Sequence, residues 1–258
     1  MAPEAVLERV AGRRKVSASL PRLEIEVHDT GGPQSLPPCP YEFPPAEKAR
    51  SDGLIGIGGD FSPSTVIAAY SQGIFPWPHP EQELLWFSPD PRAVIELDGP
   101  HVSRRLARTI AQGRFRVTMN AAFDAVVALC AEREDEGTWI TPNYCDGYSA
   151  LHRLGWAHSF EVWTLNGALA GGLYGVAIGG LFGAESMFHR VTDASKIAMV
   201  ALLQRARDVG AGVVDVQVIT EHTRRMGAVE IPRREYLRRL GAEQGRELRW
   251  SAPLKVFS

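Results

Sequence analysis

Cysteine, net charge and long apolar runs are all scarce in this sequence, and each shortage excludes a class of protein. The 258 residues contain only three cysteines, Cys39, Cys130 and Cys145, and no CxxC pair. We therefore expect neither a disulfide scaffold nor a cysteine-ligated zinc site, and we expect a reducing, cytoplasmic setting. The formal net charge of -2 excludes a generally basic nucleic-acid-binding surface, although it leaves room for a local basic patch.

Sequence motifs for common cofactors are missing as well. No P-loop and no HExxH motif occurs, and Ser186 lies in AESMF instead of a GxSxG nucleophile elbow. The segment GIGGDF at 56–61 lacks the last glycine of a dinucleotide-binding GxGxxG motif. His152 and His158 stand six residues apart, which is wrong for a helical metal pair. We expect neither a bound metal nor a cofactor.

One uncharged stretch, 162–184, is long enough to cross a membrane, which takes about 20 residues. Seven of its 23 residues are glycines, however, and each costs about 1 kcal/mol in a helix relative to alanine. Asn166-Gly167 and Gly179-Gly180 are typical hairpin turns. The stretch is therefore predicted to form strands and not a membrane helix. The N-terminus also lacks the apolar run of a signal peptide.

Proline, glycine and charge patterns divide the chain into three parts. Residues 1–35 are predicted to form a weakly ordered extension. Residues 36–98 are predicted to form a small N-terminal α/β domain, with a helix that begins after Ser62 and ends before Gly73. Residues 99–250 are predicted to form a larger domain in which helices pack on a mostly antiparallel sheet. Its strands are expected at 115–120, 158–164, 168–178, 181–188 and 213–218, and its longest helix is expected to reach Val209.

The strand VVDVQV places a carboxylate and an amide where they could act together. Asp215 and Gln217 are two residues apart, so their side chains project from the same face of a strand. Such a pair suits the orientation of an amine nucleophile. The alternative is an edge strand with a solvated polar face. Glu185 follows the glycine-rich strands and could bind a cation, or it could simply cap a turn at the end of its strand.

Tryptophans in loops and clustered arginines both fit a nucleic-acid ligand. Trp77 in FPWP and Trp139 in GTWITP could each stack on a base, although core packing is the ordinary role of tryptophan. No acidic residue occurs between Asp98 and Asp124, whereas several arginines do. Together they could bind phosphates or form an ordinary solvated helix face. These arginines are Arg104, Arg105, Arg108, Arg114 and Arg116.

Several segments, taken in order, resemble one family. They are GLIGIGGDFSPSTVIAAYSQGIFPWP, WFSPDPRAVI, RVTMNAAFDAVV, EGTWIT, LHRLGWAHSFEVW, GGLYGVAIGGLFGAESMF, DASKIAMVAL, VDVQV and GAVEIPRREYL. The chain resembles the bacterial leucyl/phenylalanyl-tRNA–protein transferases over roughly residues 40–240. The resemblance implies a small N-terminal domain followed by a GNAT-like acyltransferase domain.

The resemblance also implies an activity that needs no cofactor. Leu or Phe, and less readily Met, would pass from aminoacyl-tRNA to the α-amino group of a protein that begins with Arg or Lys. The new N-terminal residue would mark that protein for degradation through the N-degron pathway. The implied partners are therefore aminoacyl-tRNA and these protein substrates, with no membrane, and we expect a monomer.

Individual site residues follow from the same matches. Trp77 and Trp139 would hold the 3′ adenosine of the tRNA, and Glu185, Asp215 and Gln217 would form the reaction centre. Asp215 would accept a hydrogen bond from the attacking amine. The donor side chain would lie among Leu173, Phe182, Leu202 and Met187. The clustered arginines, and not a motif match, suggest that Arg104, Arg105 and Arg108 would hold acceptor-stem phosphates.

Three positions depart from the family's usual residues: Ala184, His189 and Leu202. Leu202 stands where an aromatic residue can occur, so the preference between Leu and Phe stays open. The segment FHRVTDASK lacks the glycine-rich loop with which GNAT enzymes bind the pyrophosphate of coenzyme A. Two alternatives remain. One is another N-acyltransferase of this fold, and the other is a non-catalytic binder of tRNA or of protein N-termini.

Overall fold

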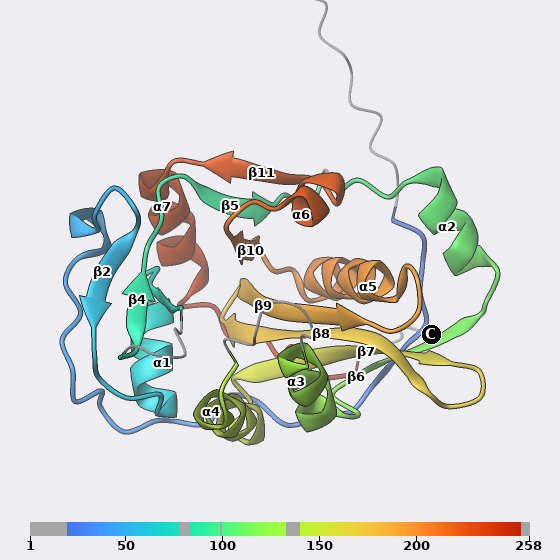
Figure 1. Ribbon diagram of the computed structural model, residues 1–258, viewed down its shortest axis with the longest axis horizontal. Coiled ribbons are helices and arrows are strands. Elements are labelled where there is room, and N and C mark those ends of the chain that lie inside the picture. The colour runs from blue at the N-terminus through green and yellow to red at the C-terminus, as the bar shows by residue number, and fades with distance from the viewer. Residues whose placement is uncertain (1–19, 78–82, 99, 133–139, 254–258) are drawn as a thin grey trace, which may run out of the picture.

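The computed structural model describes residues 20–77, 83–98, 100–132 and 140–253 (Figure 1). Its α-helices are α1 (Pro63–Tyr70), α2 (Arg104–Ala111), α3 (Phe123–Ala131), α4 (Pro142–Arg153), α5 (Ala194–Val209), α6 (Glu221–Arg225) and α7 (Arg233–Glu243). Its strands are β1 (Ile25–Val27), β2 (Leu54–Ile57), β3 (Phe75–Pro76), β4 (Leu85–Phe87), β5 (Arg92–Ile95), β6 (Phe115–Met119), β7 (Ala157–Thr164), β8 (Leu169–Ile178), β9 (Leu181–His189), β10 (Val213–Gln217) and β11 (Ala228–Ile231).

A large mixed sheet organises the molecule, with the strand order β1-β6-β7-β8-β9-β10-β5-β11. The pairs β1–β6 and β9–β10 are parallel, and the other neighbours are antiparallel. A second, antiparallel sheet has the order β2-β4-β3. The predicted α/β class is therefore confirmed.

The glycine-rich stretch forms the hairpins β7–β8 and β8–β9, as predicted from its turns. Gly167 and Gly179 have positive φ angles of 86° and 53°, which residues with a Cβ rarely adopt. A Cβ on Gly175 would lie 2.1 Å from the carbonyl oxygen of Gly183, so close strand packing requires glycine there. No helix in the described ranges is long and apolar enough to cross a membrane.

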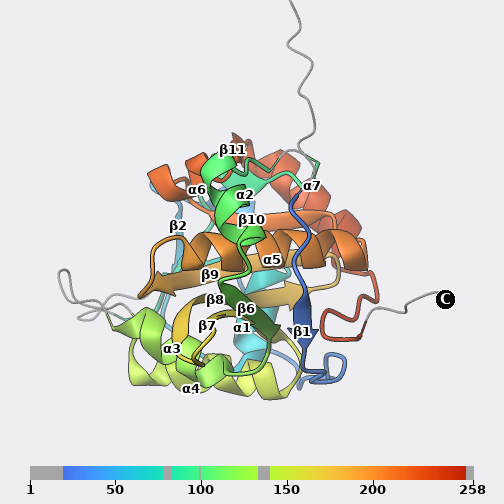
Figure 2. The same ribbon diagram turned by 90° about the vertical axis from the view of Figure 1, so that its right-hand side faces the viewer.

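Helices cover both faces of the large sheet (Figures 1 and 2). Helix α5 packs on one face, and α3 and α4 pack on the other, together with α1. Twelve of the 16 residues of α5 are buried, so other segments cover the side of this helix that faces away from the sheet. One of them is the segment before β1, where the Gln204 side chain bonds both backbone groups of Leu23.

This contact belongs to a region where the sequence-based expectation was wrong. The sequence predicts a weakly ordered extension over residues 1–35, but within it β1 pairs with β6 and packs against the core, together with Leu23, Ile25 and Val27. The physical reason is the alternation of these apolar residues with Glu24 and Glu26, which is typical of a half-buried strand. Residues 1–19 lie outside the described residues.

The structure adds a qualification to the predicted domain division at residue 98. Strand β5 comes from the predicted small domain, yet it lies between β10 and β11 in the large sheet. The division of the chain into domains at 36–98 and 99–250 stays a prediction. Because β10 is an interior strand, the alternative that Asp215 lies on a solvated edge strand is wrong.

Candidate active site

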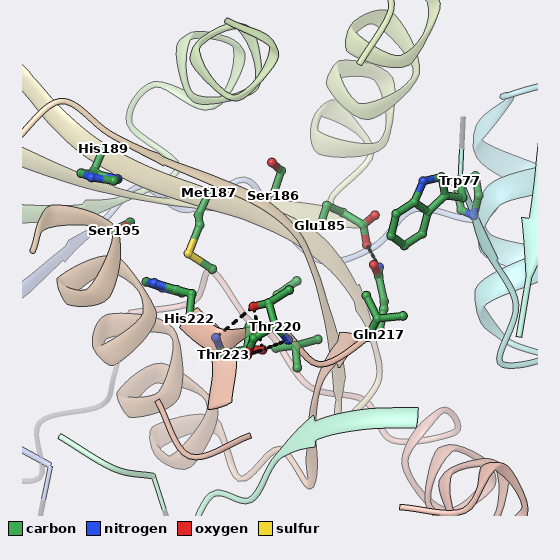
Figure 3. A pocket seen from close by; sticks show the side chains of 14 residues that line it. Trp77, Glu185, Ser186, Met187, His189, Ser195, Gln217, Thr220, His222 and Thr223 are labelled. Carbon is green, nitrogen blue, oxygen red and sulfur yellow. Dashed lines mark hydrogen bonds between the residues drawn. The ribbon is translucent and has the colours of Figure 1, made fainter. Parts of the chain in front are cut away.

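A cavity of about 430 Å³ opens beside the ends of β9 and β10 (Figure 3). Trp77, Glu185 and Gln217 lie at one end of it, and Ser195 and His222 lie toward the other end. Met187 lines the cavity between the two ends. The cavity therefore brings together residues that are far apart in the sequence.

The parallel pairing of β9 and β10 explains why Glu185 and Gln217 meet. Gly183 is paired with Asp215, and both strands continue in the same direction from that pair. Two residues further along each strand are Glu185 and Gln217. The amide Nε2 of Gln217 lies 3.0 Å from Oε1 of Glu185 and donates a hydrogen bond to it.

Among the described residues, the donors that hold the Glu185 carboxylate are all neutral. Its Oε1 accepts from the Tyr70 hydroxyl at 2.5 Å and from Gln217, and its Oε2 accepts from the Tyr148 hydroxyl at 2.8 Å. Burial raises the pKa of Glu185 from 4.5 to about 7, although these three hydrogen bonds favour the ionised form. Glu185 therefore changes protonation state close to neutral pH.

Gln217 has an unusual backbone conformation that its neighbours stabilise. Its φ angle is 64°, in the left-handed region, and the pairing with β5 is irregular between Asp215 and Gln217. The Gln217 backbone N–H donates to Oδ1 of Asp215 at 2.8 Å. Because its side-chain Nε2 donates to Glu185, the carbonyl oxygen of the Gln217 amide is left to accept from a ligand in the cavity.

Asp215 is fully buried beneath the cavity and does not line it. Arg92 donates to both of its oxygens, from Nε at 2.9 Å and from Nη2 at 2.7 Å, and the Tyr236 hydroxyl adds a third donor at 2.8 Å. The N–H of Gln217 is the fourth. The prediction that Asp215 accepts a hydrogen bond from the substrate amine is therefore wrong, because its oxygens are already occupied. Asp215 is linked to the cavity through the hydrogen bond that it accepts from the backbone N–H of Gln217.

The other predicted site residues occupy three kinds of position. Trp77 lies at the cavity edge with 43% of its surface exposed, and Met187 lies in the cavity wall. Leu173, Phe182 and Leu202 are fully buried in the core and are not among the residues that line the cavity. Leu173 is paired with Met187 across β8 and β9, so these two side chains are neighbours.

The remaining predicted residues lie away from the cavity or cannot be placed. Trp139 lies outside the described residues. Arg104, Arg105 and Arg108 are exposed on α2, and Nε of Arg105 lies 3.7 Å from Oδ2 of Asp193, just before α5.

Sequence reasoning missed Tyr70, Tyr148, Arg92 and Tyr236, which bind the two carboxylates. A weak signal existed for Arg92, because it opens the otherwise apolar strand RAVI. The tyrosines carry no signal of this kind, since α1, α4 and α7 place them among ordinary core residues. Within the described ranges, no group of three His, Cys, Asp or Glu residues could hold a metal ion.

Two polar atoms at the cavity lack a hydrogen-bond partner among the described residues: Oγ of Ser186 and Nε2 of His222. Buried polar groups are normally paired. Ser186 and His222 are two of the exceptions to this rule among the described residues.

A mixed α/β fold with a carboxylate–amide pair at a cavity has the form of an enzyme active site, and comparison with known proteins agrees. The family model described as leucyl/phenylalanyl-tRNA protein transferase matches residues 94–241, and the model of that family's N-terminal domain matches residues 59–90. This chain belongs to the leucyl/phenylalanyl-tRNA–protein transferase family, as the sequence motifs predicted.

Curated relatives show how far the similarity extends. A leucyl/phenylalanyl-tRNA–protein transferase from Anaeromyxobacter sp. (strain Fw109-5) is 51% identical, over 79% of this chain and 88% of that one. The protein of the same name from Citrobacter koseri is 47% identical, over 84% of this chain and 94% of the relative. Among solved structures, L-PGS from Bacillus licheniformis matches 55% of this chain and 45% of its own, with 13% identity and a TM-score of 0.34.

Proposed function

We propose that this enzyme transfers Leu or Phe, and less readily Met, from aminoacyl-tRNA to proteins that begin with Arg or Lys. The observation that carries the proposal is the Glu185–Gln217 pair at the cavity of a chain that belongs to this family. Its amide carbonyl is free to orient an attacking amine. The product would carry a new N-terminal residue that marks it for the N-degron pathway, and we expect the enzyme to act in the cytoplasm.

The reaction is aminolysis of an ester. The α-amine of the acceptor attacks the ester carbonyl, so a C–N bond forms and the bond from the carbonyl carbon to the ribose oxygen breaks. The amine loses one proton, and the ribose oxygen of the tRNA gains one. A free α-amine has a pKa of about 7.7–8.0, so a useful neutral fraction exists near neutral pH.

Orientation of the amine would supply most of the rate. The Gln217 carbonyl oxygen accepts a hydrogen bond from the amine, and Asp215 acts indirectly by holding the Gln217 backbone. Asp215 is therefore a positioning residue in this proposal, and Glu185 orients the amide.

The donor would be bound at the Trp77 end of the cavity. Trp77 offers an exposed indole on which the terminal adenine can stack, with Trp139 as the expected second aromatic residue. The donor side chain would lie against Met187, with Leu173 beside it and the core residues Phe182 and Leu202 beneath. One methylene in such a pocket is worth only about 1–3 kcal/mol, so the selection among Leu, Phe and Met should be leaky.

The start of α5 argues against coenzyme A as the donor of a GNAT-like fold. Helix N-termini attract anions, and GNAT enzymes are expected to bind the pyrophosphate at this one. Here Asp193 precedes the helix and is paired with Lys196 at 2.7 Å. A carboxylate at this position disfavours a second anion. The phosphates of the tRNA would instead approach Arg104, Arg105 and Arg108.

The test is transfer of radiolabelled Leu from Leu-tRNA to a peptide beginning with Arg, without ATP or coenzyme A. A peptide that differs only by an N-terminal Ala is the control. We expect label on the Arg peptide alone. Binding of the tRNA without label on either peptide would support the non-catalytic alternative, whereas label transferred only from an acyl-coenzyme A would support the other acyltransferase.

A further inference from the structure

Two tyrosines from separate parts of the chain meet at Glu185. Tyr70 is the last residue of α1, in the region that matches the family's N-terminal domain, and Tyr148 lies in α4. Both side chains are fully buried, and each donates to a different oxygen of the carboxylate, at 2.5 Å and 2.8 Å. Within the part of the chain that the structure describes, Glu185 thus has three donors, with Gln217 as the third, and no cation among them.

The arrangement ties the direction of the Gln217 amide to the charge of Glu185. An ionised carboxylate can only accept, so the Gln217 amide turns its N–H₂ group toward Glu185 and its carbonyl oxygen toward the cavity. A protonated Glu185 could donate to that carbonyl oxygen instead. The amide would then present N–H₂ to the cavity, and it could not accept a hydrogen bond from an amine.

The charged and titratable groups around Glu185 come from several elements. Asp215 on β10 disfavours ionisation of Glu185, while Arg92 on β5 is bound to Asp215 and offsets its charge. Tyr174 on β8 packs against Tyr148 with 4.9 Å between ring centroids. The two tyrosine hydroxyls are therefore the main groups, apart from Gln217 itself, that favour the ionised carboxylate.

We propose that Tyr70 and Tyr148 are positioning residues for the transfer reaction: they keep Glu185 an acceptor, and Glu185 in turn presents the Gln217 carbonyl oxygen to the attacking amine. The inference rests on the proposed function and deepens it. It also gives the N-terminal region an indirect part in the reaction, because Tyr70 would act through Glu185 and would not touch the substrate.

The test is the pH dependence of single-turnover transfer by Tyr70→Phe and by Tyr148→Phe, between pH 6 and pH 9. Loss of one hydrogen bond to a charged group should move the acidic limb of the profile upward by roughly one to two pH units. The rate near pH 7 should fall roughly 5- to 50-fold and recover toward pH 9. The acceptor amine contributes equally to every profile, so it does not affect the comparison.

The matched control is Tyr144→Phe, one turn before Tyr148 on the same helix. Tyr144 is also buried, and its ring packs against Phe61 with centroids 4.3 Å apart. We expect it to keep the wild-type profile. In a Glu185→Gln background, the additional Tyr70→Phe change should cause no pH-dependent loss, because no carboxylate remains to titrate.

The outcomes separate this inference from the function on which it rests. A wild-type enzyme that fails to label the Arg peptide would overturn the proposed function. An active wild type whose two tyrosine variants keep the wild-type profile, or lose the same fraction of rate at every pH, would overturn the positioning role. Circular dichroism shows which variants are folded, and either folded tyrosine variant is sufficient for the test.

Discussion

Two carboxylates on neighbouring parallel strands have opposite surroundings in this protein. Asp215 is bound by the guanidinium of Arg92, and its remaining hydrogen bonds come from Tyr236 and the Gln217 backbone. Glu185 lines the cavity and is bound by two hydroxyls and an amide, and no cation from the described ranges pairs with it. The first is a closed structural ion pair, and the second can change its protonation state at the wall of the cavity.

One residue, Gln217, is bound by both carboxylates. Gln217 is held through its backbone by Asp215 and through its side chain by Glu185. The ion pair fixes where the amide lies, because it stabilises the left-handed conformation of Gln217. The second carboxylate fixes which way the amide faces. Changes to the two regions should therefore have different consequences, for stability in one case and for pH dependence in the other.

Removal of the cation from the Asp215 region should have the largest effect. Arg92→Met leaves a fully buried carboxylate without its charged partner, and breaking such a pair typically costs about 3–5 kcal/mol. The free energy of unfolding in urea measures this loss. Arg92→Met combined with Asp215→Leu should recover much of it, since neither charge is then buried. A loss below about 1 kcal/mol in the single variant would contradict the assignment.

Ionisation of Glu185 should make the free energy of unfolding depend on pH. Its pKa in the folded protein is about 7, above the ordinary 4.5, so its stabilising contribution is complete below pH 4.5 and disappears as the pH rises to 7. Over this range the wild type should lose about 3 kcal/mol relative to Glu185→Gln. Urea unfolding of both proteins at pH 4.5 and pH 7.5 measures the change. An equal difference at both pH values would show that burial does not raise this pKa.

Gln217, which both carboxylates hold, should determine the rate of transfer. Gln217→Ala removes the acceptor for the amine, and we expect single-turnover transfer to fall about 100-fold. Gln204→Ala is the matched control, because Gln204 is equally buried but bonds the backbone of Leu23 instead. Near-wild-type transfer by the Gln217 variant, with tRNA still bound, would remove Gln217 from the mechanism.

The smallest effect should come from an arginine–carboxylate pair that resembles Arg92–Asp215 in geometry but not in burial. Arg238 donates to Glu235 from two nitrogens, each at 2.8 Å, on the solvent side of α7. Water screens such a pair, so Arg238→Ala should leave the melting temperature unchanged within error. A drop as large as that of Arg92→Met would show that burial is not what separates the two pairs.

Local patterns were enough to predict much of the fold. The hairpins of the glycine-rich stretch follow from Asn166-Gly167 and Gly179-Gly180, and α5 follows from its apolar pattern and from Gly210, which ends it in the left-handed conformation. The alternation of apolar residues and glutamates around β1 was a signal of the same local kind that had been overlooked. By contrast, nothing near β5 indicates that it crosses into the large sheet, because a long-range pairing leaves no periodic trace.

The residues of the candidate site were predictable from local patterns, but the direction of their side chains was not. The strand pattern of VVDVQV and the family motifs pointed to Glu185, Asp215 and Gln217, and the structure places the three together. The period of two residues nevertheless predicted that the side chains of Asp215 and Gln217 project from the same face of the strand. The irregularity between them, and the arrival of Arg92 from β5, turned Asp215 inward. The sequence of β10 shows neither the irregular pairing nor the contact with Arg92.

The sequence by itself determined the family, the main elements and the polar residues of the candidate site, because these are carried by local spacing and by motifs. Only the tertiary structure decided which partner each carboxylate has. Tyr70, Arg92 and Tyr148 reach the site from α1, β5 and α4, across large separations in the chain. The charge of a buried group depends on such neighbours and on exclusion of water, so the different roles of Glu185 and Asp215 arise only when the chain is folded.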